Sequence, residues 1–598
     1  MCGIFGIVSA REREDLGAIL VEAGQRLAYR GYDSVGCATV DAAGTIDLRK
    51  DVGRLEVVSE QLQLREMRGQ CGIVQLRWAT FGAPSRRNAQ PHLDCDGDMV
   101  GAHNGNVVNN VQLQERFARQ GHTLRGTNDG ETCVHAVEHR FDRCGGDMVN
   151  ALRRAYDDLA GDYAFLITHR DENRLYAIKK GSGLVAGLGP DFTCASSDLP
   201  SLLPLTRTVL RVHDGEILVL SPERVRIVSV ATGQEIVREP EEITESMESV
   251  TKGGYPHFML KEIHEQPTVA GELLHLLDQS VHVDRFLEIL RASEPIFLVG
   301  CGTSYHACLL GAYYFNQIAG RLTVPMLPGQ FITRAAASIG ARAAAAFVSQ
   351  SGETKDVLNA VKVARSRACR ILGVLNVIGS TLTHVSETYL PLACGYEISV
   401  PATKTFMNQS LLFLYLAYRL AGRDPAELDA VPGLLEATIA AADEPARRVA
   451  DTLSAWDELY YLGYGLTEPI ALEGALKLKE ITYTHCEGIF SAEFKHGPLS
   501  AVRPGYPVTF FTAPSDVDMM INHVNEVTCR DGWAIAIAQE SDALRANVHD
   551  YLPVPPSEQW MFPLLATVPA QLVAYHASVA RGLDPDFPRN LSKTLTVD

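Results

Sequence analysis

The chain of 598 residues is too long for a single small module, and at about 150 residues per domain it is expected to form three or four domains. Its content of 46% hydrophobic and 21% charged residues is typical of a globular protein, and no apolar run approaches the ~18 residues of a membrane span. A net charge of -18 opposes binding to nucleic acid, because a phosphate backbone is also negative. We therefore expect a soluble protein with neither a nucleic-acid nor a membrane partner.

The cysteine pattern bears on the cellular compartment. The chain has thirteen cysteines, an odd number, and no two are spaced as C-x-x-C. The N-terminus lacks the basic and then apolar layout of a signal peptide. We therefore expect free thiols in a reducing, cytoplasmic setting.

Residues 2–240 are predicted to form a strand-rich domain. Short apolar runs such as Cys71 to Leu76 and Tyr163 to Thr168 lie close to Gly and Asp residues, which is typical of strands joined by turns. Residues 241–254 are predicted to be a linker, because glutamates accumulate there before the Gly253-Gly254 pair.

The start of the chain carries a candidate nucleophile. Cys2 is small enough for Met1 to be trimmed, which exposes an α-amine on the same residue as the thiol. With an unperturbed pKa of about 7.7 to 8.0, that amine can accept the thiol proton near neutral pH. The alternative for an isolated Met-Cys start is a buried cysteine without a chemical role.

Several motifs after Cys2 favour the catalytic interpretation. They are, in order, Arg30-Gly31-Tyr32-Asp33-Ser34, Arg77-Trp78-Ala79-Thr80, His103-Asn104-Gly105 and Asn128-Asp129-Gly130-Glu131. With these motifs, residues 2–240 resemble the glutaminase domain of the N-terminal-nucleophile (Ntn) amidotransferases. The resemblance implies an α+β Ntn fold and hydrolysis of glutamine at Cys2.

The side chains in these motifs suit the chemistry of glutamine. The guanidinium of Arg77 can hold the α-carboxylate, with Thr80 as a further glutamine-binding residue, and the carboxylate of Asp129 can hold the α-ammonium. Asn104 and the backbone N–H of Gly105 can donate hydrogen bonds to the oxyanion. Taken alone, Arg77 and Asp129 could form a surface ion pair, and Asn104-Gly105 could be a hairpin turn.

Two positions depart from the pattern of the family. Phe81 and Gln90 each stand where the family usually has histidine, which leaves the details of glutamine contact open. The resemblance alone implies that Trp78 is the gate through which ammonia leaves the glutamine site.

Beyond the linker, apolar runs alternate with longer helical patterns. Ile296 to Val299 precede the helical Ser304 to Ile318, and Ala344 to Val348 precede the helical Lys355 to Arg365. This alternation predicts an α/β domain with a parallel sheet over residues 255–430.

The next segment repeats this layout. Leu459 to Gly463 has the apolar run and the glycine of Phe297 to Gly300, and a long helical pattern follows each of them. Glycines and prolines interrupt the helical pattern between Ala421 and Gly433. The sequence therefore predicts a second, duplicated α/β domain over residues 431–583, followed by an extended tail over residues 584–598.

Two hydroxyl-rich turns follow predicted strands of the first α/β domain. One is Gly300-Cys301-Gly302-Thr303-Ser304-Tyr305, and the other is Ser349-Gln350-Ser351-Gly352-Glu353-Thr354. Each turn places hydroxyls and free N–H groups at the start of a helix, which suits a phosphate, although Ser and Thr also serve there as simple N-caps. We expect sugar-phosphate binding by Thr303, Ser304, Ser349, Gln350, Ser351 and Thr354.

These turns resemble the motifs of the sugar-isomerase (SIS) fold. The order of the domains resembles the glutamine:fructose-6-phosphate amidotransferase (glucosamine-6-phosphate synthase) family over essentially the whole chain. Tyr255 to Pro267 is similar to the start of the first SIS domain of that family. Glu397 to Lys404 is similar to its sugar-contacting loop, which implies sugar binding at Val400. Pro401 and Ala402 replace a usual alanine-serine pair, so the choice of sugar stays open.

A helix predicted over Ala471 to Glu480 supplies acid-base candidates. Glu473, Lys477 and Glu480 recur at i, i+4 and i+7 on one face, where the simplest interpretation is a solvated stripe of charges. The segment is very similar to the catalytic helix of the family. The resemblance implies that Glu480 moves a proton between C1 and C2 of the sugar and that Lys477 assists at a sugar oxygen.

The resemblance implies two further catalytic groups. His496 corresponds to the ring-opening histidine, which serves a neighbouring subunit and so implies a homodimer. Lys593 corresponds to the lysine that forms an imine with the ketose. Without the resemblance, His496 would be a lone loop histidine and Lys593 a solvated surface residue. The resemblance predicts that the tail over residues 584–598 is ordered and buried between domains.

The resemblance as a whole implies a two-site enzyme that needs no metal and no organic cofactor. Glutamine and a ketose phosphate are the expected substrates, and fructose 6-phosphate is expected to become glucosamine 6-phosphate. Amination of a different or nucleotide-linked keto-sugar by the same mechanism stays open, as does a non-enzymatic sensor of sugar phosphates. A phosphoribosyl amidotransferase, which also begins with a cysteine, is disfavoured by the two hydroxyl-rich turns.

Overall fold

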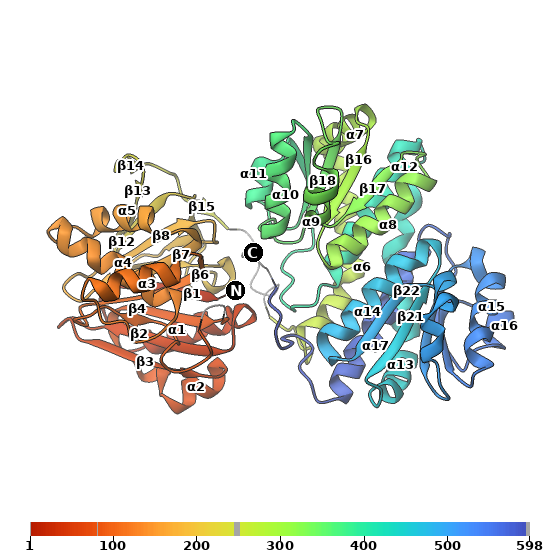
Figure 1. Ribbon diagram of the computed structural model, residues 1–598, viewed down its shortest axis with the longest axis horizontal. Helices are drawn as coiled ribbons and strands as arrows, with labels where there is room; N and C mark the ends of the chain where they lie inside the picture. The colour runs from red at the N-terminus through yellow and green to blue at the C-terminus, as the bar shows by residue number, and fades with distance from the viewer. Residues whose placement is uncertain (1, 80–81, 244–250, 594–598) are drawn as a thin grey trace. The chain divides into compact units, whose positions relative to one another are not determined.

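Two units make up the chain in the computed structural model, which describes residues 2–79, 82–243 and 251–593 (Figure 1). The first unit ends and the second begins between residues 250 and 251, inside the predicted linker. No helix in these described ranges is long and apolar enough to cross a membrane.

The first unit contains two antiparallel sheets, as its short apolar runs predict. The eight-stranded sheet has the order β15 (Glu241–Glu242), β11 (Thr208–Arg211), β9 (Val185–Leu188), β10 (Phe192–Ser196), β1 (Gly3–Arg13), β4 (Gly69–Arg77), β2 (Ser34–Val40) and β3 (Ile46–Val52). The seven-stranded sheet has the order β14 (Glu235–Ile236), β13 (Arg224–Ser229), β12 (Glu216–Ser221), β8 (Leu175–Lys180), β7 (Gly161–His169), β6 (Met99–Val107) and β5 (His92–Leu93).

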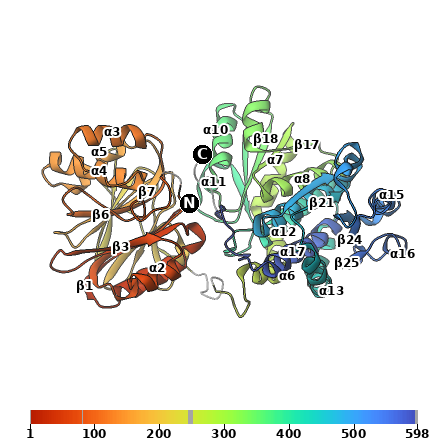
Figure 2. The same cartoon turned by 60° about the horizontal axis from the view of Figure 1, so that its bottom comes forward.

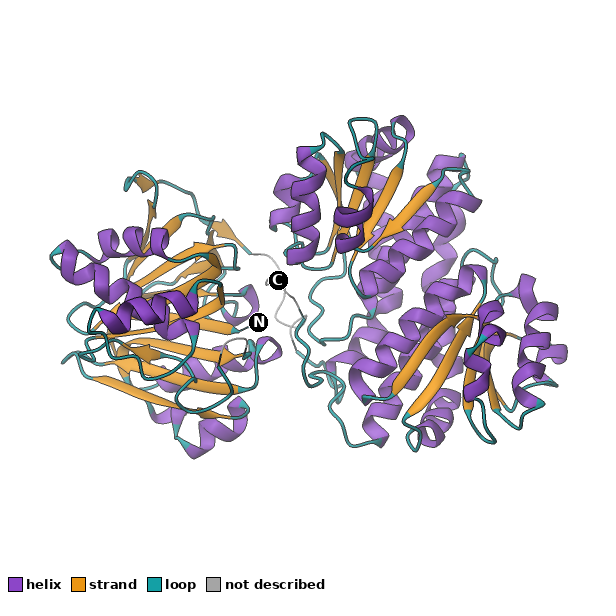
Figure 3. Ribbon diagram, in the orientation of Figure 1, coloured by secondary structure: helices purple, strands orange, loops and turns teal. Residues whose placement is uncertain are grey.

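The two sheets pack face to face, and helices cover their outer faces (Figure 3). Ile4 and Val8 of β1 share one core with Ala102 of β6 and Leu166 of β7, because alternate residues of each strand point between the sheets. The helices are α1 (Leu16–Gln25) and α2 (Leu55–Gln61) on the eight-stranded sheet, and α3 (Asn110–Arg119), α4 (Asp129–Phe141) and α5 (Met148–Asp158) on the other. This arrangement confirms the predicted α+β class.

The second unit begins with a five-stranded parallel sheet. Its order is β17 (Thr323–Met326), β16 (Ile296–Gly300), β18 (Ala344–Ser349), β19 (Arg370–Leu375) and β20 (Thr388–Pro391). The associated helices are α6 (Phe258–Gln279), α7 (Val281–Ala292), α8 (Thr303–Gln317), α9 (Pro328–Gln330), α10 (Lys355–Ser366), α11 (Thr381–Val385) and α12 (Lys404–Ala421). Phe297 and Leu298 of β16 face different cores, so the sheet is apolar on both sides and helices cover both faces.

A second parallel sheet repeats this topology. Its order is β22 (His485–Phe490), β21 (Glu458–Gly463), β23 (Pro507–Thr512), β24 (Trp533–Gln539) and β25 (Asp550–Val554). Its helices are α13 (Val431–Leu453), α14 (Glu468–Thr482), α15 (Val517–Thr528), α16 (Asp542–Arg545) and α17 (Phe562–Ala580), and they also lie on both faces (Figure 2). In each sheet the second strand pairs beside the first, and the third strand pairs on its other side. The predicted duplication of the α/β domain is therefore confirmed.

The two parallel sheets belong to one compact unit because they share a core. Leu298 and Val348 of the first sheet and Tyr461 and Ile537 of the second are buried in the same cluster, together with residues of α12 and α17. The division predicted at residues 430 and 431, like the other domain limits, stays a prediction.

The segment between helices α12 and α13 is shorter than the sequence indicates. Helix α12 ends at Ala421, and Gly422 adopts a left-handed conformation with φ of 72°. Helix α13 already begins at Val431, so the expectation that Pro432 and Gly433 interrupt helical structure is wrong. Pro432 lies in the first turn of α13, where a helix tolerates a residue without an N–H.

The strand order explains where the hydroxyl-rich turns meet. In the first parallel sheet the chain moves from β16 outward to β17 and then returns to the other side of β16 as β18. Ligands of such sheets bind at the carboxyl ends of the strands where the order reverses. The turns that follow β16 and β18 therefore lie next to each other at this switch point.

Candidate active sites

Cys2 lies directly before β1, and the pairing of β1 with β4 brings it to Trp78. Gly3 is the partner of Leu76 in this ladder. The backbone N–H of Trp78 donates to Cys2 Sγ at 3.3 Å, and the thiol donates to the carbonyl of Trp78 at 3.4 Å. Arg30 Nε donates to the carbonyl of Cys2 at 3.3 Å. These contacts fix both the backbone and the sulfur of the predicted nucleophile.

The environment of Cys2 does not favour a thiolate. Burial raises the pKa of the thiol above its usual value, and Asp129 adds to the rise, whereas the N–H of Trp78 and the Arg77 guanidinium oppose it. The sulfur therefore needs a base at the moment of attack, which is the role expected of an α-amine on Cys2.

Arg77 and Asp129 are both buried, with exposed fractions of 1% and 0%, so they are not the surface ion pair that was the alternative. Arg77 ends β4, and its Nη2 donates to the carbonyl of Gly82 at 2.7 Å. Asp129 begins α4, and its Oδ2 lies 3.2 Å from His103 Nε2 and accepts from Val107 N at 3.1 Å. Burial acts to raise the pKa of Asp129, but these partners bring it below its usual value, so the residue stays a carboxylate.

Asn104 and Gly105 lie inside β6, opposite Ala164 and Tyr163 of β7, and do not form a hairpin turn. The side-chain amide of Asn104 is fully buried and has no hydrogen-bond partner within the described part of the chain. A buried amide without a hydrogen bond is unfavourable in free energy. Its N–H groups are therefore available to donate to a bound ligand. Gly105 has φ of 115°, and a Cβ there would lie 2.1 Å from the carbonyl oxygen of Asp162, so only glycine fits.

Gln90, one of the two departures from the family pattern, supports this site from within. Its Oε1 accepts from His103 N at 2.7 Å, and its Nε2 lies 3.1 Å from His103 Nδ1. His103 also contacts Asp129. Gln90 therefore positions His103, and His103 in turn positions the carboxylate of Asp129. The other departure, Phe81, and the predicted glutamine-binding Thr80 lie outside the described residues.

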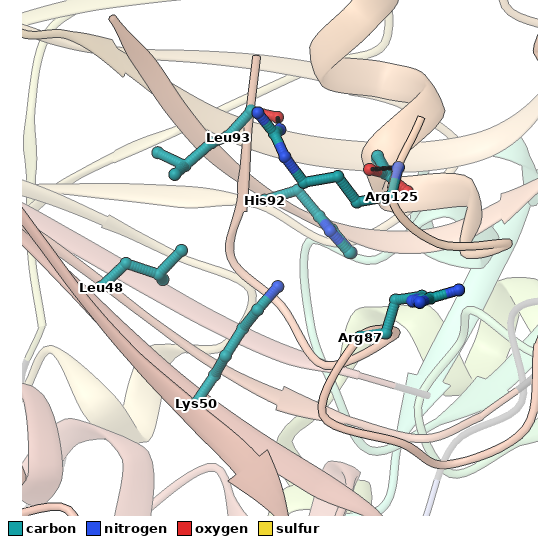
Figure 4. A pocket seen from close by; sticks show the side chains of 7 residues that line it. Leu48, Lys50, Arg87, His92, Leu93 and Arg125 are labelled. Carbon is teal, nitrogen blue, oxygen red and sulfur yellow. Dashed lines mark hydrogen bonds between the residues drawn. The ribbon is translucent and has the colours of Figure 1, made fainter. Parts of the chain in front are cut away.

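A small pocket that the sequence did not reveal adjoins the start of α4 (Figure 4). It is lined by Leu48, Lys50, Arg87, His92, Leu93, Arg125 and Glu131. His92 Nε2 lies 3.1 Å from Asn128 Oδ1, which in turn accepts from Gly130 N at 2.8 Å and caps α4. Lys50 donates to the carbonyls of Ala89 and Pro91 at 2.6 and 2.8 Å, and burial lowers its pKa to about 8. The pocket wall thus holds the turn that presents Asp129.

In the second unit, the turn after β16 meets the predicted catalytic helix α14. Thr303 Oγ1 donates to Glu473 Oε1 at 3.0 Å and accepts from Lys477 Nζ at 2.9 Å. Ser304 Oγ accepts from Gln409 Nε2 at 3.0 Å. These hydroxyls are tied to side chains of other helices, and the cap of α8 is Gly302, so neither is a simple N-cap.

The turn after β18 is held by its own hydroxyls. Ser349 Oγ and Thr354 Oγ1 lie 2.8 Å apart, and Ser349 Oγ accepts from Gly352 N at 3.0 Å. Ser351 Oγ accepts from Glu353 N at 3.2 Å. Gln350 uses its carbonyl to accept from Asn376 N at 3.0 Å. The three hydroxyls thus lie just before α10 and bond to each other or to backbone N–H groups of their own turn.

Glu473, Lys477 and Glu480 do not form a solvated stripe. The side chains of Glu473 and Lys477 are each 1% exposed and that of Glu480 is 17% exposed. Lys477 Nζ lies 3.3 Å from Glu473 Oε1 and 2.7 Å from Glu480 Oε2. Burial raises the pKa of Glu480, although Lys477 and Lys593 oppose the rise. A carboxyl group with a raised pKa can both accept a proton and give it back.

The sequence did not reveal His306, which completes this cluster. His306 Nδ1 lies 2.7 Å from Glu473 Oε2. It lies one helical turn after Thr303 on α8, and that spacing, which puts both residues on one face, is the one signal in the sequence that could have pointed to it.

Lys593 is almost completely buried, with 6% of its side chain exposed. Its Nζ lies 2.5 Å from Glu397 Oε2 and donates to the carbonyl of Ser399 at 2.8 Å. Val400 N donates to the carbonyl of Asp586 at 2.9 Å. The tail therefore lies along the predicted sugar-contacting loop, and Lys593 is not a solvated surface residue.

Two further carboxylates, missed by the sequence interpretation, hold the tail and the loop. Asp586 accepts from Phe258 N at 2.9 Å and from Met259 N at 2.8 Å at the start of α6. Glu262 accepts from Ile398 N at 2.5 Å, and burial together with Glu397 raises its pKa to about 8.

His496 is the one predicted catalytic residue of the second unit that stands apart. It is exposed at the end of the short helix Ser491–His496, which follows β22 at the edge of its sheet. Among the described residues, Lys477, Glu480 and Lys593 make no hydrogen bond or ion pair with it. Within one chain, Lys477 contacts Glu480, and Lys593 acts electrostatically on Glu480, whereas His496 contacts none of these three residues in the described part of the chain.

Comparison with known proteins gives matches over the whole chain. A family model described as SIS domain matches twice, over residues 289–419 and 452–581. A model described as glutamine amidotransferase domain matches residues 76–186. The double match corresponds to the two parallel sheets.

Several curated relatives are similar over their full length. They are named glutamine-fructose-6-phosphate aminotransferase (isomerizing) and come from Methanothermobacter thermautotrophicus (38% identical over 603 residues), Symbiobacterium thermophilum (37% over 618) and Thermococcus kodakarensis (36% over 612). Each alignment covers 100% of both chains.

Among solved structures, the C-terminal domain of glucosamine-fructose-6-phosphate aminotransferase from Francisella tularensis is 28% identical, with a TM-score of 0.52, and the match covers 56% of this chain and 99% of that one. The tagatose-6-phosphate ketose/aldose isomerase of Escherichia coli, at 21% identity and a TM-score of 0.51, shares the fold alone. Together with the full-length identities of 36 to 38%, these findings show that the chain belongs to the glutamine-fructose-6-phosphate aminotransferase family.

Proposed function

We propose that the chain transfers the amide nitrogen of glutamine to fructose 6-phosphate and isomerises the product to glucosamine 6-phosphate. The observation that carries the proposal is the buried Lys477–Glu480 pair, whose carboxyl lies within electrostatic reach of Lys593, because amination and isomerisation of a ketose require an amine and a base near one another. The names of the full-length relatives support the same pair of substrates.

In the glutamine half, Cys2 is the nucleophile. Its α-amine, freed by removal of Met1, takes the thiol proton, and the sulfur attacks the side-chain amide of glutamine. Arg77 and Asp129 hold the substrate by its α-carboxylate and α-ammonium. Ammonia leaves, and water then cleaves the thioester to release glutamate. Thr80 is a further glutamine contact.

The oxyanion of this reaction is stabilised by Asn104 and Gly105. The buried amide of Asn104 supplies one N–H, and the backbone of Gly105 supplies the other. Donors fixed in place before the reaction stabilise the developing charge without reorganisation. Trp78, which holds the sulfur of Cys2 through its backbone, gates the passage of ammonia.

In the sugar half, Lys593 attacks C2 of the opened ketose and forms an imine with loss of water. Ammonia then displaces Lys593 from C2. Glu480 removes a proton from C1 and returns it to C2, while Lys477 stabilises the charge on the sugar oxygen. The net change is that glutamine and fructose 6-phosphate become glutamate and glucosamine 6-phosphate, so no redox partner is needed.

The sugar phosphate is bound by the hydroxyl-rich turns at the switch point of the first parallel sheet. Thr303, Ser304, Ser349, Ser351 and Thr354 supply hydroxyls, Gln350 an amide, and Val400 a backbone contact to the sugar. Because the whole chain carries a net charge of -18, these local groups have to provide the attraction for an anion.

The enzyme is a homodimer in this proposal, because His496 has to open the sugar ring and lies exposed, apart from Lys477 and Glu480 of its own chain. A histidine of one subunit that serves the site of the other accounts for its position. The compartment is the cytoplasm, since all thirteen cysteines are unpaired.

The test uses purified full-length protein with glutamine and fructose 6-phosphate, followed by chromatography of the sugar phosphates. We expect glucosamine 6-phosphate and glutamate in equal amounts. Cys2→Ala should abolish glutamine-dependent synthesis and leave isomerisation of the sugar phosphate intact. Equal loss of both activities would contradict the two-site division.

A second candidate is amination of another keto-sugar by the same residues. It is favoured by Pro401 and Ala402, which follow Val400 in the sugar-contacting loop and differ from the usual alanine-serine pair. A panel of ketose phosphates and nucleotide-linked ketoses distinguishes the two. Turnover of another ketose together with none of fructose 6-phosphate would replace the first candidate by the second.

A further inference from the structure

Four side chains with metal-binding atoms meet at the side of α4, outside the residues proposed for glutamine. They are Cys95, which follows β5, His122, which follows α3, and His135 and Glu138 of α4. One ligand atom from each lies within 4.8 Å of the others. His135 and Glu138 are buried, and Cys95 and His122 are half-buried.

The separations within this cluster, which we call the Cys95 cluster, fit a tetrahedral ion. Cys95 Sγ lies 3.6 Å from His122 Nδ1 and 3.8 Å from His135 Nδ1. With zinc bonds of about 2.0 to 2.3 Å, the edges of a coordination tetrahedron measure about 3.4 to 3.6 Å. Glu138 Oε2 lies closer, 2.9 Å from His122 Nδ1 and 2.6 Å from His135 Nδ1, as hydrogen bonds would be. An ion would need this carboxylate to move outward by only about 0.5 to 0.8 Å.

The outer contacts of the same residues are those of an oriented ligand set. Metal-binding histidines usually have a partner at the other ring nitrogen. His122 Nε2 has such a partner, since it lies 3.0 Å from His139 Nδ1, whereas His135 Nε2 makes no hydrogen bond among the described residues and lies 3.9 Å from Glu131 Oε1. Thr123 N donates to Cys95 Sγ at 3.2 Å, and Cys95 N donates to Glu138 Oε1 at 2.9 Å, which leaves Oε2 for the ion.

We propose that Cys95, His122, His135 and Glu138 form a structural zinc site. A thiolate with two imidazoles favours zinc over magnesium or calcium, and four protein ligands leave no open position for catalysis. On binding, the Cys95 thiol and any protonated imidazole release their protons to solvent. The site does not enter the amidotransferase reaction, for which no metal was expected.

The site would stiffen the support of the glutamine-binding residues. It joins the segment after β5 and the segment after α3 to the middle of α4, whose first residue is Asp129. Arg125, between His122 and Asp129, already donates to the carbonyls of Asp94 and Cys95 at 2.8 and 3.2 Å. An ion would replace the side-chain hydrogen bonds among these four residues by four coordinate bonds at this junction.

The first test measures metal content of the full chain after expression with added zinc, by inductively coupled plasma mass spectrometry. We expect about one zinc per chain in the wild type, and loss of it in Cys95→Ser and His135→Gln. Cys144→Ser and His169→Gln, which change the same residue types in the same unit outside the cluster, should keep the metal. A wild type without zinc, or variants that retain it, would overturn the proposal.

A second measurement covers variants that fail to fold. Co²⁺ added to wild-type protein stripped with a chelator should give the visible bands of a tetrahedral ion and a near-ultraviolet thiolate charge-transfer band. The melting temperature of the first unit should rise when Zn²⁺ is restored. Absence of both effects in the wild type refutes the site whatever the variants do. Neither readout depends on turnover, so the result is separate from the proposed function.

Discussion

Lys593 Nζ lies 2.5 Å from Glu397 Oε2, and both side chains are buried. For the proposed attack on the sugar, Lys593 must first lose its proton, and Glu397 is the carboxylate that contacts its amine. Glu397 itself is anchored by Thr403 N, Thr405 N and Thr405 Oγ1 at 2.8 to 3.0 Å. The pair therefore fixes the last described residues of the tail against the segment from Glu397 to Thr405.

Replacing Lys593 by arginine tests this role. Lys593→Arg keeps the positive charge opposite Glu397 but removes the amine that can form an imine. We expect sugar-phosphate amination to fall by at least about a thousandfold, with hydrolysis of glutamine retained. Borohydride reduction in the presence of fructose 6-phosphate, followed by mass spectrometry of peptides, should find the sugar on Lys593 in the wild type.

A surface lysine provides the control for this substitution. Lys362 on α10 is exposed and, within the described part of the chain, donates only to Asn359 at 3.5 Å, so Lys362→Arg should leave both activities unchanged. If the Lys593→Arg variant aminates the sugar phosphate at the wild-type rate, Lys593 contributes only its positive charge and is not the nucleophile.

Glu480→Gln should separate proton transfer from binding. The amide keeps the shape of the side chain beside Lys477 but cannot accept a proton. We expect the turnover number to fall by about 10² to 10⁴, with little change in the Michaelis constant for the sugar phosphate. Loss of exchange between the C1 hydrogen of fructose 6-phosphate and solvent deuterium, followed by NMR, is the direct measurement. Glu487→Gln, an exposed carboxylate on β22, is the matched control, and undiminished exchange in Glu480→Gln would assign the base elsewhere.

Much of this site follows from local sequence patterns. A strand, a glycine and a helix in succession predict the turns at Thr303 and Ser349, and helical spacing predicts that Glu473, Lys477 and Glu480 share a face. The spacing could not decide whether that face is solvated or buried. Burial follows from the packing of α14 against α8, which the sequence does not encode locally.

The remaining parts of the site depend on contacts between segments far apart in the chain. Glu262 meets the loop before α12, and Asp586 meets the start of α6, so neither carboxylate has a neighbour in sequence that explains it. The composition of residues 584–598 predicts a loop, and the described part, residues 584–593, contains neither helix nor strand and is held by Asp586 and Lys593 through contacts far away in the sequence. The Cys95 cluster could not be predicted from the sequence for the same reason, since its residues come from three segments.

Lys50 gives a prediction about pH and stability. Burial lowers its pKa to about 8, below the value of about 10.4 expected in the unfolded chain. Between these values the unfolded chain binds the extra proton, so the free energy of unfolding should rise with pH, by at most about 1.4 kcal/mol per unit from this group. Lys50→Met should remove this rise, as measured by denaturant unfolding of the first unit between about pH 8 and 10. Lys180→Met serves as control, and identical pH profiles for wild type and Lys50→Met would exclude the effect.

Gly105→Ala should damage the glutamine site through the backbone. Gly105 has φ of 115°, and its new Cβ would lie 2.1 Å from the carbonyl oxygen of Asp162, so β6 and β7 must separate there. The N–H of residue 105 would then move away from the oxyanion, and loss of one such donor lowers turnover by about 10² to 10³. Glutaminase activity should fall by this factor, while isomerisation of the sugar phosphate in the second unit is unchanged.

The control for Gly105→Ala separates loss of the donor from strain of the backbone alone. Gly97 also has a positive φ, of 78°, but no atom lies within 4 Å of the position of its Cβ. Gly97→Ala therefore introduces an unfavourable conformation without a clash, and we expect a loss of stability of about 1 kcal/mol with normal glutaminase turnover. If Gly105→Ala lowers only the melting temperature and keeps its turnover, the N–H of this residue does not stabilise the oxyanion, and Asn104 would have to supply that stabilisation alone.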